Sequence, residues 1–225
     1  MPMLDASWSP QVRKISDLER RDHYYLTSDH DCYFFGEYTA RAGYSHSSTN
    51  QIITNIKKKP NLQGTAQWQY KARDMQRVAA AIRGAINPQS YGTVTLVPIP
   101  PSKLRTDPEH DPRMAAIARM VSPQADVREL IEPHVAREPQ HESEQRLHPD
   151  ELMATLQINE AHAAPAPQSI MLIDDVVTTG CSFVACRTLL QQRFPGVEVG
   201  GIFAARRAVD HAAVFADFAG IVDLE

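Results

Sequence analysis

The chain has 225 residues, of which 43% are hydrophobic and 22% charged, and its formal net charge is −4. This length supports one good core and a small subdomain, and the composition is that of a soluble globular protein. The negative charge argues against a general nucleic-acid-binding surface, although a local basic patch is compatible with it.

No apolar run approaches the roughly 20 residues of a membrane helix. The first residues also lack the charged and apolar regions of a secretory signal, so we expect a cytoplasmic protein. The three cysteines form no C-x-x-C pair and leave an odd count, which predicts neither a disulfide framework nor a zinc ribbon.

Residues 1–90 are predicted to contain one strand and two helices after a polar, irregular start. The aromatic segment 32–39 is typical of a strand. Several N-cap residues at 47–50, three isoleucines and the basic run 57–60 indicate a short helix. From Trp68 to Ile86 apolar residues recur at steps of three and four, which predicts a longer helix facing the core.

The rest of the chain alternates between strands and helices. The predicted strands are 93–99, 127–131, 153–158, 170–173 and 197–204. One helix begins with Asp111 as its N-cap and Pro112 at its first position, and another runs from the 178–182 region to just before Pro195. This alternation predicts an α/β fold with a mainly parallel sheet flanked by helices, divided into an N-terminal region 1–90 and a core 91–225.

Two adjacent carboxylates, Asp174 and Asp175, follow a strand that is predicted to be buried. Ligands of open α/β sheets bind beyond the carboxyl ends of the strands. Ribose hydroxyls need such acceptors, and Mg²⁺ prefers carboxylate oxygens. The pair is therefore a candidate for sugar and metal binding, whereas a chance acidic turn before a helix is the structural alternative.

The segment after these acids leads into a helix and reads Val177, Thr178, Thr179, Gly180, Cys181, Ser182. Unpaired amides and the partial positive charge of a helix N-terminus stabilise phosphate. The hydroxyls add donors, and the glycine lets the backbone close around the anion. We expect this loop to bind a phosphate group.

A proline-rich turn after the strand 93–99 carries Ser102 and Lys103. A hydroxyl and an ammonium held rigidly at the carboxyl edge of the sheet suit an anionic leaving group. A solvated lysine in an ordinary turn is the alternative.

Residues 170–182 resemble the signature of type I phosphoribosyltransferases position for position: four apolar residues, two acids, two apolar residues, two hydroxyl residues, glycine, any residue and a hydroxyl residue. The resemblance implies a Rossmann-like core that binds 5-phosphoribosyl-1-pyrophosphate with Mg²⁺. It assigns the 5′-phosphate to the loop Thr178–Ser182, the ribose hydroxyls and metal to Asp174 and Asp175, and pyrophosphate to the Ser102–Lys103 turn.

The order of elements is similar to that of the competence-type (ComF-like) members, which implies a hood over the core built from residues 1–90. The chain lacks the four-cysteine zinc module and the arginine-rich stretch of those proteins. The polar segment 134–152 falls where the family has a flexible catalytic loop, so Arg137 and Arg146, and also Arg105, are candidate pyrophosphate contacts.

The activity that the resemblance implies is transfer of the phosphoribosyl group to a nitrogenous acceptor with release of pyrophosphate. Neither the acceptor nor a general base is visible in the sequence. A non-catalytic sensor of phosphoribosyl pyrophosphate, or an effector subunit of a multi-component system, is the alternative, and a homodimer or a partner complex is compatible with both. Cys181 stands at a variable position of the motif, as a reactive thiol or simply as a small residue.

Overall fold

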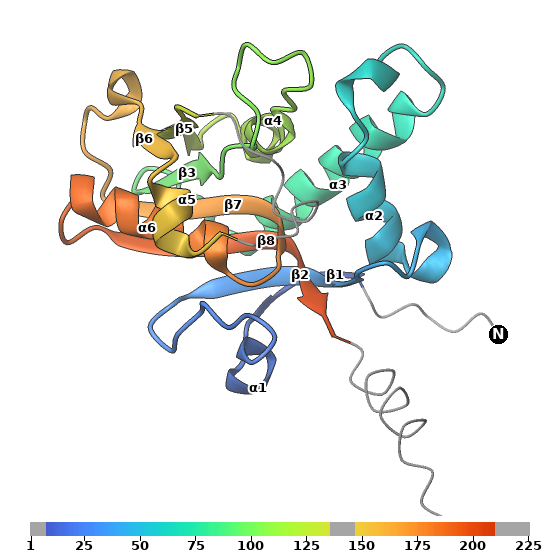
Figure 1. Ribbon diagram of the computed structural model, residues 1–225, viewed down its shortest axis with the longest axis horizontal. Helices are drawn as coiled ribbons and strands as arrows, with labels where there is room; N and C mark the ends of the chain where they lie inside the picture. Colours follow the sequence, from blue (N-terminus) through green and yellow to red (C-terminus); the bar gives the residue numbers. More distant parts are fainter. Residues whose placement is uncertain (1–7, 136–146, 210–225) are drawn as a thin grey trace, which may run out of the picture.

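The computed structural model describes residues 8–135 and 147–209. Its centre is a six-stranded sheet in the order β1-β2-β8-β7-β3-β4, in which only β1 is antiparallel to its neighbour (Figure 1). The strands are β1 (Trp8–Lys14), β2 (Cys32–Thr39), β3 (Val94–Pro98), β4 (Asp126–Val127), β7 (Ser169–Val177) and β8 (Glu198–Ala208).

Helices cover both faces of this sheet (Figure 1). One face packs against α2 (Ser48–Ile56), α3 (Trp68–Ala85) and α4 (Arg113–Val121). The other packs against α5 (Pro149–Met153), α6 (Cys181–Arg193) and a small antiparallel sheet of β5 (Ile131–Pro133) and β6 (Leu156–Ile158). Shorter turns are α1 (Asp17–Arg20), η1 (Tyr44–His46), η2 (Pro60–Leu62), η3 (Pro88–Ser90) and η4 (Glu160–His162).

Strand β7 shows why the sheet needs cover on both sides. Successive side chains of a strand point to opposite faces. Ile170 and Leu172 join the core under α6, whereas Met171 and Ile173 pack in the core under α2, α3 and α4. Apolar side chains on both faces are typical of a parallel strand buried between two layers of helices.

The prediction of an α/β fold with a mainly parallel sheet flanked by helices is confirmed. The strand predicted at 32–39 and the two helices predicted before residue 90 form as β2, α2 and α3. Strands β1 and β2 of the region 1–90 lie in the same sheet as the strands of residues 91–225, because β2 pairs with β8.

Several predicted boundaries were wrong. The strand predicted at 127–131 is two short strands, β4 and β5, which belong to different sheets. The start predicted to be irregular contains β1 and α1, and the segment 134–152 contains the start of α5. The strand predicted at 153–158 is β6, which begins at Leu156 and pairs with β5 outside the main sheet.

Helix α4 begins one residue later than predicted, with Pro112 at its N-cap and no capping side chain. The carboxylate of Asp111 instead accepts hydrogen bonds from Lys71 and Arg113. Within the described ranges, 8–135 and 147–209, no helix has the length and hydropathy needed to cross a membrane.

Candidate functional site

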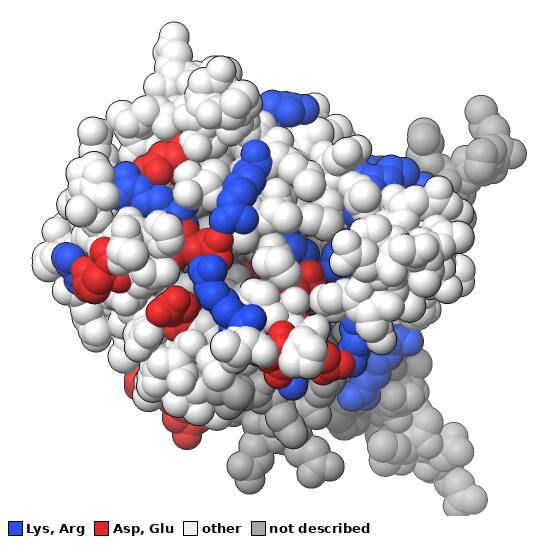
Figure 2. Space-filling view, turned by 90° about the horizontal axis from the view of Figure 1, so that it is seen from above, with Lys and Arg blue, Asp and Glu red and all other residues white. Residues whose placement is uncertain are grey.

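A cavity of about 640 Å³ opens at the carboxyl ends of β3 and β7. Ser102 and Lys103 line it from the loop after β3, and Asp174, Asp175, Thr178, Thr179 and Ser182 line it from β7 and the following loop. The structure thus brings together the two segments that the sequence singled out. Figure 2 shows acidic and basic side chains interspersed on the face of the molecule that is seen from above.

Asp175 is buried and bound by two cations. Arg113 donates to its Oδ2 from Nε at 3.0 Å and from Nη2 at 2.6 Å, and the Lys57 ammonium lies 3.3 Å from Oδ1. Burial opposes ionisation of this carboxyl, but the two cations outweigh it and hold its pKa well below the usual value. Asp175 is therefore a carboxylate at neutral pH, with both oxygens already engaged.

Asp174 lies beside it in a different environment. It is half-buried, and its Oδ1 accepts a hydrogen bond from the Asp175 amide at 2.8 Å. Burial and the negative charge of Asp175 raise the pKa of Asp174 to about 7. Within the described part of the chain it forms no ion pair, so it is the acid that can accept a hydrogen bond from a ligand.

The ion pair of Asp175 extends into a buried network beneath the cavity. Arg113 also donates from Nη1 to Asp111 at 3.1 Å, and the same oxygen of Asp111 accepts from Lys71 at 2.7 Å. Lys71 is buried and also donates to the Lys58 carbonyl at 2.6 Å; burial lowers its pKa. The network ties α2, α3 and α4 to the tip of β7.

The loop Thr178–Gly180 joins β7 to α6. Gly180 is the N-cap of α6 with a left-handed backbone (φ 86°), and the Cys181 amide donates to the Thr179 hydroxyl at 3.3 Å. The other amides of the first helical turn have no intrahelical acceptors, so this end of α6 can donate to an anion. A water-sized hollow of about 10 Å³ lies here, lined among others by Asp174, Thr178 and Ser182.

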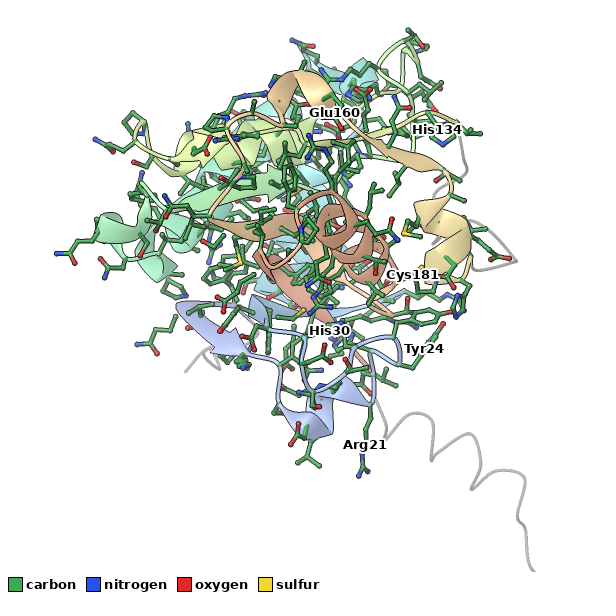
Figure 3. The ribbon with its side chains drawn as sticks, turned by 90° about the vertical axis from the view of Figure 1, so that its left-hand side faces the viewer. Arg21, Tyr24, His30, His134, Glu160 and Cys181 are labelled. Carbon is green, nitrogen blue, oxygen red and sulfur yellow. The ribbon has the colours of Figure 1, made fainter. Side chains whose placement is uncertain are left out.

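The N-terminal segment supports this loop from outside the cavity. The Tyr25 amide donates to the Thr179 carbonyl at 3.0 Å, and Nδ1 of the buried His23 bonds to the Thr178 carbonyl. A Cβ on Gly180 would lie 2.7 Å from Leu26. In Figure 3 the labelled Tyr24 and Cys181 lie on the same side of the molecule. The bonds from His23 and Tyr25 hold the carbonyls of Thr178 and Thr179 away from the cavity.

The turn that carries Lys103 has acidic neighbours. The Lys103 ammonium lies 3.9 Å from Asp107 and 4.0 Å from Glu109. Glu109 also accepts from Lys59 at 3.0 Å, which links this turn to the end of α2 across the cavity mouth. His110 lines the cavity and its Nδ1 bonds to the Lys103 carbonyl at 3.1 Å.

The other predicted residues do not all face the cavity. Val177 is buried in the core under α6. Cys181 is buried, and its thiol donates to the Leu147 carbonyl at 3.2 Å, so it does not present a nucleophile to the cavity. Arg105 lines the cavity and pairs with Glu129 at 2.7 Å. Arg137 and Arg146 lie outside the described residues.

The described lining carries equal numbers of cationic and anionic side chains. The cations are Lys57, Lys59, Lys103, Arg105, Arg113 and Arg207, and the anions are Glu109, Asp111, Glu129, Glu132, Asp174 and Asp175. A cavity of balanced charge does not by itself attract a polyanion, so a highly charged ligand needs a counter-ion.

The described residues contain no group of three His, Cys, Asp or Glu side chains that could hold a metal ion alone. Mg²⁺ commonly binds through one or two carboxylates, with substrate phosphates and water completing its shell. Asp174 fits that role. Asp175 does not fit as a direct ligand, because Lys57 and Arg113 occupy its oxygens.

Sequence reasoning missed Arg113 as a site residue and took Lys57 only as a helix-ending charge. A weak signal for Arg113 existed, since a cation in the first turn of a helix opposes the helix dipole and therefore calls for an acidic partner. That partner lies 62 residues away, and no local pattern identifies it. No family model matches the sequence, and no curated protein matches it.

Proposed function

We propose that the chain is a phosphoribosyltransferase with a Rossmann-like type I core, which binds 5-phosphoribosyl-1-pyrophosphate together with Mg²⁺ and transfers the phosphoribosyl group to a nitrogenous acceptor. One observation carries the proposal. Asp174, the loop at the start of α6 and the Ser102–Lys103 turn line one cavity. Two anion-binding segments with a carboxylate between them suit a sugar with phosphate at one end and pyrophosphate at the other.

The 5′-phosphate is assigned to the loop Thr178–Ser182. The start of α6 supplies the amide donors that follow Cys181 and a favourable dipole. Thr178, Thr179 and Ser182 line the cavity and add hydroxyl donors. The hollow of about 10 Å³ accepts one atom of water size, so the phosphate itself lies in the larger cavity.

Asp174 is assigned to the ribose hydroxyls. It is accessible from the cavity and forms no ion pair in the described part of the chain. Asp175 has a different role, since its pairs with Lys57 and Arg113 fix the end of β7 and supply the negative charge that helps to raise the pKa of Asp174.

Pyrophosphate is assigned to the Ser102–Lys103 turn, with Arg105 at its edge. Bound Mg²⁺, held at Asp174 and by the substrate, would neutralise charge on the leaving group. A balanced cavity needs such neutralisation before a polyanion enters it. For the turn to bind pyrophosphate, the Lys103 ammonium must leave Asp107 and Glu109, which lie 3.9 and 4.0 Å away, and contact the ligand instead.

The reaction is a displacement at the anomeric carbon. The acceptor nitrogen forms a bond to C1′ while the bond from C1′ to the pyrophosphate oxygen breaks, and that electron pair leaves with pyrophosphate. The acceptor then loses its N–H proton to water. Asp174 offsets the positive charge that develops on the ribose ring, and donors in the Ser102–Lys103 turn stabilise the departing oxygen.

A sensor that binds the same ligand without turnover is the second candidate. The acidic neighbours of Lys103 favour it, because an ammonium shared with Asp107 and Glu109 stabilises a departing pyrophosphate less well. The first candidate requires pyrophosphate release, whereas the second requires only saturable binding.

The test is release of pyrophosphate from 5-phosphoribosyl-1-pyrophosphate and Mg²⁺ in the presence of a panel of purines, pyrimidines and other nitrogenous acceptors. We expect release with at least one acceptor and its loss in Asp174→Asn. Asp17→Asn, at an exposed acid of α1, is the control and should behave as wild type. Binding without release across the panel moves the assignment to the sensor, and absence of binding rejects both.

A further inference from the structure

The positive charge of the chain is concentrated in one segment. Residues 40–92 contain eight Lys and Arg residues and a single acid, Asp74, although the whole chain has a net charge of −4. This segment includes α2 and α3. Asp74 is buried, where it accepts from Asn55 at 2.6 Å and pairs with Arg73 at 3.0 Å, so no acid of α3 faces solvent.

The exposed side of α3 carries aromatic and guanidinium groups together. Tyr70 and Arg73 are three residues apart, and Arg73 and Arg77 four, so the three side chains are neighbours on the helix surface. Tyr70 is 41% exposed. Arg73 and Arg77 are exposed as well, whereas Arg83 follows Arg77 by six residues and lies about 120° around the helix from it. We call Tyr70, Arg73 and Arg77 the α3 arginine face.

Cations already stack on the rings of this region. Lys58 and Arg73 lie 5.1 and 5.2 Å from the centre of the Tyr70 ring, and Arg77 lies 5.5 Å from that of Trp8 on the neighbouring strand β1. An exposed ring with cations beside it suits a base and its neighbouring phosphates.

We propose that the α3 arginine face binds a single-stranded nucleic acid. From Tyr70 to Arg77 the helix extends about 10 Å, which matches about three phosphates of a stacked strand. Lys58 packs on Tyr70, and the lysines on either side of it in the chain, Lys57 and Lys59, line the cavity. A strand on this face therefore passes close to the cavity mouth.

Other anionic partners fit the face less well. A helix that lies on a membrane needs large apolar side chains beside its cations, and Tyr70 is the one large apolar residue that α3 exposes. An acidic peptide would pair with the arginines but would leave the rings unused. Single strands use both kinds of group, and their bases stack on any aromatic face.

The test is fluorescence anisotropy of a labelled oligothymidylate of about 20 nucleotides with the full chain at several salt concentrations. Single strands lose about 0.7 in the slope of log K against log salt for each phosphate neutralised. The two arginines of this face together with Lys58 therefore predict a slope of about −2, and Arg77→Ala should reduce its magnitude by about 0.7. Arg73 is kept because it pairs with the buried Asp74.

Tyr70→Leu, which keeps an apolar side chain but removes the ring, should weaken binding about fivefold or more. Arg193→Ala is the control, because Arg193 is a half-exposed arginine in the last turn of α6, on the other face of the sheet. No saturable binding at low salt, equal binding by the α3 variants, or tighter binding of an acidic peptide or anionic vesicles would each overturn the proposal. None of these results depends on the transfer reaction.

Discussion

Arg113 donates two hydrogen bonds to a single oxygen of Asp175, from Nε at 3.0 Å and from Nη2 at 2.6 Å. The two residues come from the start of α4 and the end of β7, so this contact fixes the distance between two elements that border the cavity. Lys57 holds the second oxygen from the end of α2. Three elements thus meet at one buried carboxylate.

Removing Arg113 should therefore destabilise the fold. Arg113→Ala leaves Asp175 buried with Lys57 alone, and breaking a buried ion pair typically costs about 3–5 kcal/mol. Because Lys57 remains and Arg113 is partly exposed, we expect a loss of about 2 kcal/mol in the free energy of unfolding, measured by urea denaturation. Arg105→Ala, which breaks an exposed pair with Glu129, should cost less than about 1 kcal/mol. Equal losses would contradict the role given to Arg113.

Asp174 should make stability depend on pH. Its pKa is raised to about 7 in the folded chain from about 3.9 in the unfolded chain. Between these values the folded state binds the extra proton, so stability falls as pH rises from about 4 to 7.

Asp174→Asn removes this dependence. The shift of about three units corresponds to about 4 kcal/mol, at about 1.4 kcal/mol per unit. Because Asp174 is half-buried and water screens part of this energy, the variant should gain about 2 kcal/mol over wild type at pH 8 and almost nothing at pH 4, measured by urea denaturation. Asp17→Asn, at an exposed acid, should show no such difference. A gain that is the same at both pH values would show that Asp174 is not protonated in the folded chain.

Gly180 should be hard to replace for two separable reasons. Its φ of 86° costs a residue with a side chain about 1–2 kcal/mol, and a Cβ would meet Leu26 at 2.7 Å. Gly196 has a φ of 83°, and a Cβ added there would have nothing within 4 Å, so Gly196→Ala carries the backbone cost alone.

The difference in unfolding free energy between Gly180→Ala and Gly196→Ala thus measures the Leu26 clash, which we expect to add about 1 kcal/mol or more. In a Leu26→Ala background that difference should shrink, since residues in contact are not additive. An unchanged difference would mean that Leu26 does not pack over the loop.

His23 should position the phosphate loop through its bond to the Thr178 carbonyl. Burial lowers its pKa, so the ring is neutral and Nδ1 is the donor. The amide nitrogen of an asparagine reaches the same place, so His23→Asn should keep the affinity for ribose 5-phosphate within about threefold. His23→Ala should weaken it about tenfold, the effect of one lost hydrogen bond. Calorimetric titration measures both, and equal affinities in the two variants would remove His23 from the site.

The sequence predicted best those features that depend on local patterns. The aromatic run 32–39, the apolar stripe from Trp68 and the acids after Ile173 each identify an element or a site segment within a short window. Strand β1 was missed because Pro10 and its polar neighbours do not resemble a strand; pairing with β2 stabilises it. Tertiary context overrides propensity in such a segment.

The candidate site could also be predicted only in part. The two acids and the phosphate loop could be identified from the sequence because they are consecutive in the chain, from Asp174 to Ser182. The ion pairs of Asp175 with Lys57 and Arg113, and the support that His23 gives to Thr178, join residues far apart in the chain. These contacts also decide that Asp174 and Asp175 differ in protonation, which two adjacent acids in a sequence do not reveal.

The most direct test of the central claim is calorimetric titration of 5-phosphoribosyl-1-pyrophosphate with Mg²⁺ into the wild-type chain, Asp174→Asn and Ser182→Ala. We expect saturable binding at one site per chain, weakened about tenfold in each variant by the loss of one ligand contact and unchanged in Asp17→Asn. Failure of the wild type to bind, or equal affinity in all four proteins, would show that this cavity is not a phosphoribosyl pyrophosphate site.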